Sequence, residues 1–342
     1  MRIALLGLPQ SGKKTLFTLL TGRAVPASHK AHEELEGAAA VADPRVDRLV
    51  EMFRPRKVTY AENRFVLCPD VTAAGGRDWY DAARSCDLLC LVVRAFASAH
   101  VYHPAGGIDP DRDLQLLHTE LVIADLERVM NRLLRIEKEK IRGPSPAREL
   151  EERALRRVWE VLDAGRCCDD IVLDDDERKA LQNLNPATLR PVLAVWNVSE
   201  EAIGMPAAAD RFVVCAQIES EIRTLADARE RREYLEALGI ESPGLDRLNR
   251  AAYARLGLMS FYTVGPDEVR AWTIRRGARA PEAGSRIHSD IARGFIRVEV
   301  IKYDDLIAAG SERAVKDQGK AQLRGRDYVM EDGDICHFLF NV

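Results

Sequence analysis

The sequence predicts an α/β protein with a parallel sheet, a helical hairpin inserted into it and a small β-rich domain after it. Short apolar runs alternate with helical patterns over residues 2–215, which is typical of a parallel sheet covered by helices. The stretch between residues 95 and 190 has helical periodicity and no strand signal. From residue 259 onward, aromatic and β-branched residues and turn signals become more frequent. These three observations define the expected fold class.

Apolar runs mark the expected strands of the sheet. One of them, DLLCLVVR, is apolar over almost its whole length, as in a strand that is buried on both faces. The first run is followed directly by a helix over residues 13–20. The expected strands are residues 2–6, 64–68, 87–94, 191–197 and 211–215.

Two amphipathic helices form the expected insertion, at about residues 112–188. Apolar residues recur at a period near 3.6 along the first helix, GPSP at 143–146 ends the pattern, and a second helix follows. The face predicted to pack consists of Leu117, Leu121, Ala124 or Ile123, Leu126, Met130, Leu133 and Ile136 or Glu137 in the first helix, and Leu150, Ala154, Val158 and Leu162 in the second. The outer faces are dense in Glu, Lys and Arg, so they are either a solvated surface or a partner-binding arm.

Composition limits the class of protein. The chain has 342 residues, 46% hydrophobic and 30% charged, as is usual for soluble globular proteins. It lacks a run of about 18 apolar residues, and its apolar start is too short for a signal peptide, so we expect a cytoplasmic protein without a membrane partner. A net charge of −4 argues against coating nucleic acid through bulk charge. The seven cysteines show no zinc-site spacing, which favours reduced, buried thiols.

The segment GLPQSGKKT, residues 7–15, predicts a phosphate-binding loop. It follows a strand and opens a helix, and Gly7, Gly12 and Lys13 occupy the motif positions. In such a loop the backbone N–H groups and the positive end of the helix bind phosphate, and the lysine reaches the β- and γ-phosphates. Lys14 stands where the motif requires Ser or Thr. The candidate nucleotide-binding residues here are Gly7, Gln10, Ser11, Gly12, Lys13, Lys14 and Thr15.

The ends of the fourth and fifth expected strands predict a base-binding region. The fourth strand ends in Asn197-Val198-Ser199-Glu200, where GTP-binding folds have Asn-Lys-x-Asp. The fifth ends at Cys215-Ala216, in the position of the loop that closes over the base. Asn197, Val198, Glu200 and Ala216 therefore join the candidate nucleotide-binding residues.

Beyond these motifs, the chain resembles the YchF-type Obg-like ATPases, which belong to the Obg lineage of P-loop GTPases. The resemblance covers nearly the whole chain. It includes GLPxxGKxT at 7–15, ADPRVDRL at 42–49, LVVRAF at 91–96, NVSE at 197–200, CAQIESEI at 215–222 and GRDYVMEDGDICHFLFNV at 325–342. Because several of these stretches are long and specific, the chain is identified as a divergent member of that family.

The resemblance implies a P-loop nucleotide-binding domain of the Obg type at residues 1–258, which contains the helical insertion, and a TGS-like β-grasp domain at 259–342. It implies binding of ATP, with GTP as the second candidate. It also implies association with the ribosome or RNA through the insertion and the TGS-like domain. Lys13 carries over as the phosphate lysine, and Asn197 and Glu200 carry over as base-reading residues.

The sequence departs from the family at the groups that sense metal and γ-phosphate. The family has a serine that coordinates Mg²⁺ where this chain has Lys14, whose ammonium group has donors but no acceptor. The threonine of the first switch falls near Ala31, in a stretch without hydroxyl residues. The second switch keeps Asp70, a candidate for holding a metal-bound water, but has Ala73 in the frame of the sensing glycine.

These departures predict a change in hydrolysis more than in nucleotide binding, because phosphoryl transfer depends largely on positioning and on the metal. Lys14 either takes the place of the metal beside the phosphates or points to solvent, and the need for Mg²⁺ stays open. The expected function is a purine-nucleotide-binding protein with weakened or altered hydrolysis. The alternative is a non-catalytic pseudo-nucleotidase that acts as a protein or RNA interaction module. No residue is assigned a catalytic role.

Arginines are frequent in the expected C-terminal domain. Clustered arginine suits a phosphate backbone and is also ordinary on exposed strands, so contact with RNA is one of two interpretations. These residues are Arg270, Arg275, Arg276, Arg279, Arg286, Arg293 and Arg297.

Overall fold

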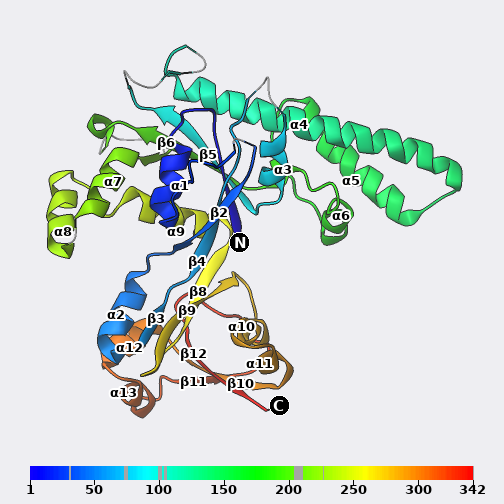
Figure 1. The fold of residues 1–342 in the computed structure, drawn as a ribbon. Helices are drawn as coiled ribbons and strands as arrows, with labels where there is room; N and C mark the ends of the chain where they lie inside the picture. The colour runs from blue at the N-terminus through cyan, green and yellow to red at the C-terminus, as the bar shows by residue number, and fades with distance from the viewer. Residues whose placement is uncertain are drawn as a thin grey trace. The chain divides into compact units, whose positions relative to one another are not determined.

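The computed structural model describes residues 1–30, 32–72, 76–98, 102–103, 106–203, 211–225 and 227–341, apart from the side chains of residues 142 and 228. The chain forms two compact units, both drawn in Figure 1. Unit 1 contains Met1–Ala39 and Arg64–Leu248, and unit 2 contains Ala40–Asn63 and Asn249–Val342. Each unit has its own sheet.

The sheet of unit 1 has the order β2-β4-β1-β5-β6-β7. The pairs β1–β4, β1–β5, β5–β6 and β6–β7 are parallel, which confirms the predicted parallel sheet. Strand β2 was not predicted, since its sequence LEGAAA has little of the bulky apolar character of a strand. The strands are β1 (Arg2–Leu6), β2 (Leu35–Ala40), β4 (Glu62–Leu67), β5 (Leu88–Ala95), β6 (Val192–Val198) and β7 (Phe212–Val214).

Helices cover this sheet and share its core. Residues of β1 and β5 pack with Trp79 of α3, Leu117 of α4 and Ile218 of α7 in one buried apolar cluster. Strand β5 is buried from Leu88 to Arg94, as its apolar sequence predicted. The helices of unit 1 outside the hairpin are α1 (Lys13–Thr21), α3 (Asp78–Arg84), α7 (Ala216–Thr224) and α8 (Ala228–Ala237), and α9 (Gly244–Arg255) begins in this unit.

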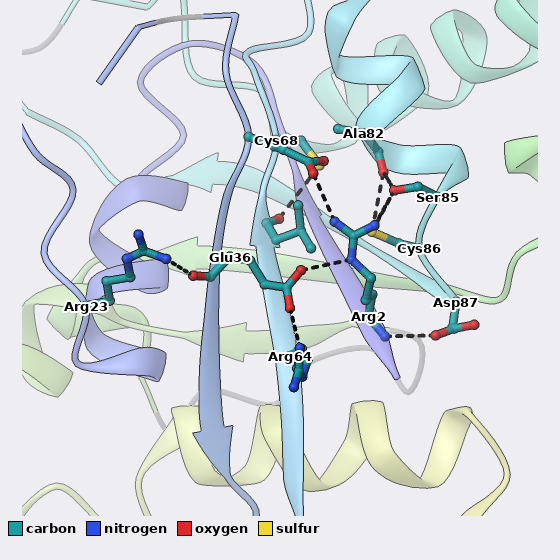
Figure 2. Close-up of polar contacts among 11 residues, drawn as sticks. Arg2, Arg23, Glu36, Arg64, Cys68, Ala82, Ser85, Cys86 and Asp87 are labelled. Atoms are coloured by element: carbon teal, nitrogen blue, oxygen red, sulfur yellow. Dashed lines mark hydrogen bonds and ion pairs between the residues drawn. The ribbon is translucent and has the colours of Figure 1, made fainter. Parts of the chain in front are cut away.

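The amino end of the sheet is held together by Arg2, as Figure 2 shows. Its guanidinium donates to Glu36 of β2 at 3.0 Å and to Ser85 at 2.8 Å, and its backbone N–H donates to Asp87 at 2.8 Å. Arg64 of β4 donates to the other oxygen of Glu36 at 3.1 Å. These bonds attach β2 and the start of β5 to the centre of the sheet, at the edge opposite the glycine-rich loop.

The inserted hairpin consists of α4 (Pro110–Glu139), η1 (Lys140–Arg142), α5 (Pro146–Asp163) and α6 (Asp175–Ala180). The two long helices lie side by side and extend away from the sheet of unit 1 (Figure 1). Val129 and Ile136 of α4 pack against Leu155 and Val158 of α5. Met130, predicted on the packed face, is exposed instead. The packed seam of α4 repeats every seven residues, at Val122, Val129 and Ile136, so a stripe read at 3.6 residues per turn drifts away from it along a long helix.

The sheet of unit 2 has the order β11-β10-β12-β8-β9-β3. Pairs β8–β9 and β10–β12 are antiparallel, and β8 meets β12 in parallel, which is the expected β-grasp arrangement. Helices α10 (Ala280–Ile287) and α11 (Ser289–Arg293) contribute to its core with Phe261, Val298 and Phe338. The strands are β3 (Lys57–Thr59), β8 (Leu258–Thr263), β9 (Glu268–Arg275), β10 (Phe295–Ile301), β11 (Gln322–Arg324) and β12 (Ile335–Phe340). Helices α12 (Tyr303–Ala309) and α13 (Glu312–Asp317) complete its C-terminal part.

Residues 40–63, which the sequence analysis placed in the nucleotide-binding domain, pack within unit 2. Helix α2 (Pro44–Phe53) starts at Asp43, whose carboxylate accepts from the N–H of Arg45 at 3.0 Å. Arg45 pairs with Asp332 at 3.0 Å and lies over the ring of Tyr262. Among the described residues, no helix combines the length and apolar content needed to cross a membrane.

Candidate nucleotide-binding site

The glycine-rich loop joins β1 to α1 at the carboxyl edge of the sheet. Gly12 precedes α1 with a φ of 89°, a left-handed conformation that favours glycine. A Cβ at Gly12 would lie 2.2 Å from Nδ2 of Asn197, and a Cβ at Gly7 would lie 2.6 Å from the carbonyl oxygen of Val92. Both motif glycines are therefore required by space, and Gly12 also by conformation.

Lys13 lies across the loop. Its side chain is 3% exposed, and its Nζ donates to the carbonyl oxygen of Gly7 at 3.2 Å and pairs with the carboxylate of Asp70. Burial lowers the pKa of Lys13, while the negative charge of Asp70 acts in the opposite direction. The structure thus brings together two predicted site residues that are far apart in the sequence.

Lys14 and Thr15 lie in the first turn of α1 with exposed side chains. Neither side chain has a hydrogen bond or an ion pair within the part of the chain that the structure describes. The first N–H groups of a helix have no partner inside the helix, and α1 has no side-chain cap. The loop therefore offers open backbone donors beside two lysines, a combination suited to an anion.

Asn197, at the end of β6, connects two loops of the site. Its side chain is buried, its Nδ2 donates to the carbonyl oxygen of Ser11 at 3.2 Å, and its Oδ1 accepts from the N–H of Ala216 at 3.1 Å. The amide therefore fixes the glycine-rich loop relative to the start of α7. Sequence order predicted that these residues meet, but not that both ends of the amide bind backbone.

The other predicted residues surround this connection. Val198 is buried in β6, whereas Glu200 is exposed at the start of a short 3-10 helix. Ser11 is buried, and its Oγ has no hydrogen-bond partner. Gln10 is exposed and has a φ of 65°. The loop thus contains a strained backbone position and a buried hydroxyl next to its open donors.

Sequence reasoning missed an aromatic and cationic pair beside the loop. Arg94, at the end of β5, is buried and lies 4.7 Å from the ring centre of Phe96. The ring of Phe96 would lie 3.8 Å from a Cβ built on Gly12. Both residues belong to the segment LVVRAF, whose order along the sequence could have suggested that they reach the site.

A buried histidine lies near the start of α4. Nε2 of His103 is 2.8 Å from Oδ2 of Asp113, and both side chains are buried. Arg112 donates to the other oxygen of Asp113 at 2.8 Å. The spacing of the histidines gave no signal for this pair.

The metal-binding part of the predicted site is only partly described. Ala31 and Ala73, on which the switch predictions rest, lie outside the described residues. Among the described residues, no cluster of three or more His, Cys, Asp or Glu side chains could hold a metal ion. Asp70 is described, and its carboxylate is paired with Lys13.

The seven arginines singled out in the C-terminal part fall into two groups. Arg270 lies over Trp272, Arg279 pairs with Asp327, and Arg293 pairs with Asp290. The remaining four have exposed side chains without an ion pair among the described residues: Arg275, Arg276, Arg286 and Arg297.

A parallel sheet, a glycine-rich loop at its carboxyl edge and a lysine folded across that loop define a P-loop α/β fold. The chain belongs to the YchF family. It is 34% identical to the "Ribosome-binding ATPase YchF" of Bacillus subtilis, covering 99% of this chain and 98% of that protein. It is 36% identical to the protein of the same name in Haemophilus influenzae, covering 100% and 99%.

The C-terminal part and the whole fold are similar to known proteins as well. A family model named YchF-GTPase_C, described as a protein of unknown function (DUF933), matches residues 258–341. The solved structure of the Schizosaccharomyces pombe YchF GTPase is 27% identical, with a TM-score of 0.83 over 99% of this chain and 97% of that chain. The fold class is therefore as the sequence predicted.

Proposed function

We propose that this chain binds a purine nucleotide, ATP in preference to GTP, and associates with the ribosome or RNA. The observation that carries the proposal is the arrangement of Lys13, which is buried and directed across the loop, beside the uncapped first N–H groups of α1. The names of the relatives supply the ribosome and the ATPase activity, which for this chain remain part of the proposal.

The residues of the loop fit a phosphate group. A nucleoside triphosphate brings negative charge, which the N-terminus of α1 and the ammonium group of Lys13 would hold. Because Gly7 and Gly12 have no side chain, the backbone of the loop can lie close to β5 and β6. Asn197 would keep the loop that contains Ala216 in place, and Glu200 stands at the exposed end of β6 for contact with the base.

We propose weakened hydrolysis because Lys14 cannot replace the hydroxyl ligand of a metal ion. In a phosphoryl transfer, charge on the transferred group must be neutralised, and the metal supplies much of that effect. Lys14 is exposed in the first turn of α1, next to Lys13, and its positive charge contributes to lowering the pKa of Lys13. That position suits either hypothesis for Lys14, contact with phosphate or contact with solvent.

A second candidate function is a non-catalytic interaction module. The observation that favours it is the ion pair between Asp70 and Lys13. This pair occupies both the acid expected on the metal side and the lysine expected to contact phosphate. In both cases we propose a cytoplasmic protein with domains at 1–258 and 259–342 of the sequence, the first containing the insertion at about 112–188 and contributing residues 40–63 and 249–258 to unit 2. The insertion and the four exposed arginines of the second domain are the proposed contacts with RNA or the ribosome.

Titrations with fluorescent analogues of ATP, ADP and GTP, each with and without Mg²⁺, test this proposal. We expect Lys13→Ala to weaken binding by about 10- to 100-fold, because it removes a charge-assisted contact. Lys179→Ser, at an exposed position of α6, is the control and should bind as the unchanged protein does. Lys14→Ser distinguishes the two hypotheses: a gain of Mg²⁺ dependence indicates that Lys14 takes the metal's place.

Three results would contradict parts of the proposal. If none of the three nucleotides binds, nucleotide binding is wrong and the interaction module becomes the favoured function. If the unchanged protein hydrolyses ATP rapidly and only with Mg²⁺, the argument for weakened hydrolysis fails. If purified ribosomes do not sediment with the protein in any nucleotide state, the proposed association is wrong.

A further inference from the structure

Helix α4 presents a row of apolar side chains to solvent. Leu116, Ile123, Met130, Leu134 and Ile141, the last in η1 directly after the helix, are each at least 40% exposed, and Ile141 reaches 90%. At 3.6 residues per turn these positions fall within about 40° of one another around the axis. Several exposed apolar residues on one side of a helix, in contrast to single scattered ones, mark an interaction surface.

This row is separate from the face that holds the hairpin together. Val129 and Ile136 of α4 are fully buried against Leu155 and Val158 of α5. The exposed row therefore contributes nothing to the core of the hairpin. Its distal part is called here the tip surface, formed by Met130, Leu134 and Ile141 with the neighbouring Arg135 and Lys138.

Ion pairs fix the shape of the hairpin below the tip surface. Arg132 of α4 pairs with Glu139 at 3.0 Å and with Glu151 of α5 at 2.7 Å. Arg148 of α5 donates to the carbonyl oxygen of Glu139 at 2.9 Å. A surface that is already ordered loses less conformational entropy on binding, so these contacts favour recognition by the tip.

The charged side chains around the tip surface are mostly paired with one another. Glu137 pairs with Lys140 at 2.8 Å, and Glu139 and Glu151 pair with Arg132, whereas Glu149 in the first turn of α5 is exposed and forms no ion pair among the described residues. Arg135 and Lys138 are exposed, and within the described residues neither forms an ion pair. At 3.6 residues per turn, Lys138 lies about 40–80° around the helix from Met130, Leu134 and Ile141, and Arg135 lies about 100–140° from them. These two cations are the charges that an acidic ligand on the tip surface would complement.

The composition of the tip favours a protein ligand over RNA. Residues 130–150 contain no aromatic side chain on which a base could stack, and single-stranded RNA is recognised largely by stacking. Large exposed aliphatic side chains instead suit an apolar protein surface. The row from Met130 to Ile141 spans about 17 Å, or three helical turns.

We infer that the tip surface docks an acidic amphipathic helix of a partner protein, with its apolar face on Met130, Leu134 and Ile141 and its carboxylates near Arg135 and Lys138. This inference does not depend on nucleotide binding. A partner lacking either the apolar face or the acidic border would lose one of the two complementary features.

The probe is a synthetic 18-residue helix with Leu at positions i, i+3, i+4 and i+7 and Glu on its remaining surface. Its binding to the full-length protein is measured by fluorescence anisotropy against a scrambled peptide of the same composition. We expect Ile141→Ser and Lys138→Glu each to weaken binding by about tenfold or more, as for residues central to an interface. Val172→Ser and Lys179→Glu, at exposed positions elsewhere in unit 1, are matched controls and should not change it.

Several results would overturn the inference. Equal binding of the scrambled peptide means that charge alone attracts it. Unchanged binding in both Ile141→Ser and Leu134→Ser means that the apolar row is not used. If a single-stranded 20-nucleotide RNA binds more tightly than the peptide, and Lys138→Glu but not Ile141→Ser weakens it, the tip is an RNA contact. Because all substituted side chains are exposed, unchanged circular dichroism spectra would confirm that the variants are folded.

Discussion

Polar contacts hold helix α4 differently in two regions: at its root, where the hairpin joins the rest of unit 1, and toward its tip. At the root, Asp125 is fully buried and accepts hydrogen bonds from the hydroxyl of Tyr80 and from the N–H groups of Ala187 and Thr188, the latter two at 3.0 and 2.7 Å. Toward the tip, Arg132 forms its ion pairs at the surface, with a quarter of its side chain exposed. Water competes for the contacts at the tip but cannot reach those at the root.

The comparison teaches where unit 1 depends on polar groups for its stability. Asp125 joins α4 to α3 and to the 3-10 helix η2 (Ala187–Leu189), so one carboxylate positions three elements. Glu219 of α7 has a similar role, because its carboxylate accepts from the N–H of Gly244 at 2.5 Å at the start of α9. Buried carboxylates thus connect distant parts of the chain, whereas surface ion pairs shape a local hairpin.

The largest effect is expected from removing the carboxylate at the root. Asp125→Ala leaves the N–H groups of Ala187 and Thr188 and the hydroxyl of Tyr80 buried without an acceptor. We expect the free energy of unfolding to fall by about 3–5 kcal/mol, since each unsatisfied buried group costs about 1–3 kcal/mol. Urea unfolding followed by circular dichroism measures this change.

Asp125→Asn is the matched control for the same site. Burial raises the pKa of Asp125, so the fold tolerates a neutral side chain there better than the loss of both oxygens. The asparagine retains one acceptor and should lose less stability than the alanine. A loss below about 1 kcal/mol in Asp125→Ala would contradict the difference between root and tip.

The second effect concerns pH and the other buried carboxylate. Burial raises the pKa of Glu219 from its ordinary value of 4.5 to about 7, and the hydrogen bonds from Gly244 and Leu245 act in the opposite direction. Between these two pH values, the folded protein therefore keeps a proton on Glu219, whereas the unfolded chain has released it. As pH rises through this window, the contribution of Glu219 should lower the free energy of unfolding by up to about 3 kcal/mol. The protein should therefore be most stable at the acidic end of the window.

The variant Glu219→Gln isolates this contribution, because every other group titrates equally in both proteins. The free energy of unfolding of the unchanged protein minus that of the variant is measured from pH 4 to pH 8. We expect this difference to decrease with rising pH and to level off above pH 7. A difference that is constant over the range would show that Glu219 is not a buried titrating group.

Much of this architecture could be predicted from the sequence, because continuous apolar runs identify buried parallel strands. Strands β2 and β3 were missed because LEGAAA and KVT owe their place to pairing with a neighbour and not to their own apolar content. Lys13 and Asp70 were both predicted as site residues, and they share one edge of the sheet because they follow the carboxyl ends of parallel strands, but their ion pair was not predicted. The contacts of Asp125 could not be predicted, because they depend on how the hairpin docks onto α3 and η2.

The smallest effect is expected at the tip. Arg132→Ala removes the ion pairs with Glu139 and Glu151, and because these lie at the surface we expect a loss of only about 0.5–1 kcal/mol in the free energy of unfolding. The effect should shrink further in 1 M salt, which screens exposed charges, whereas the effect of Asp125→Ala should not change with salt. Urea unfolding of both variants at low and high salt measures this. If Arg132→Ala costs as much as Asp125→Ala and is equally insensitive to salt, the tip is held by desolvated contacts like those of the root, and the distinction between the two ends of the hairpin fails.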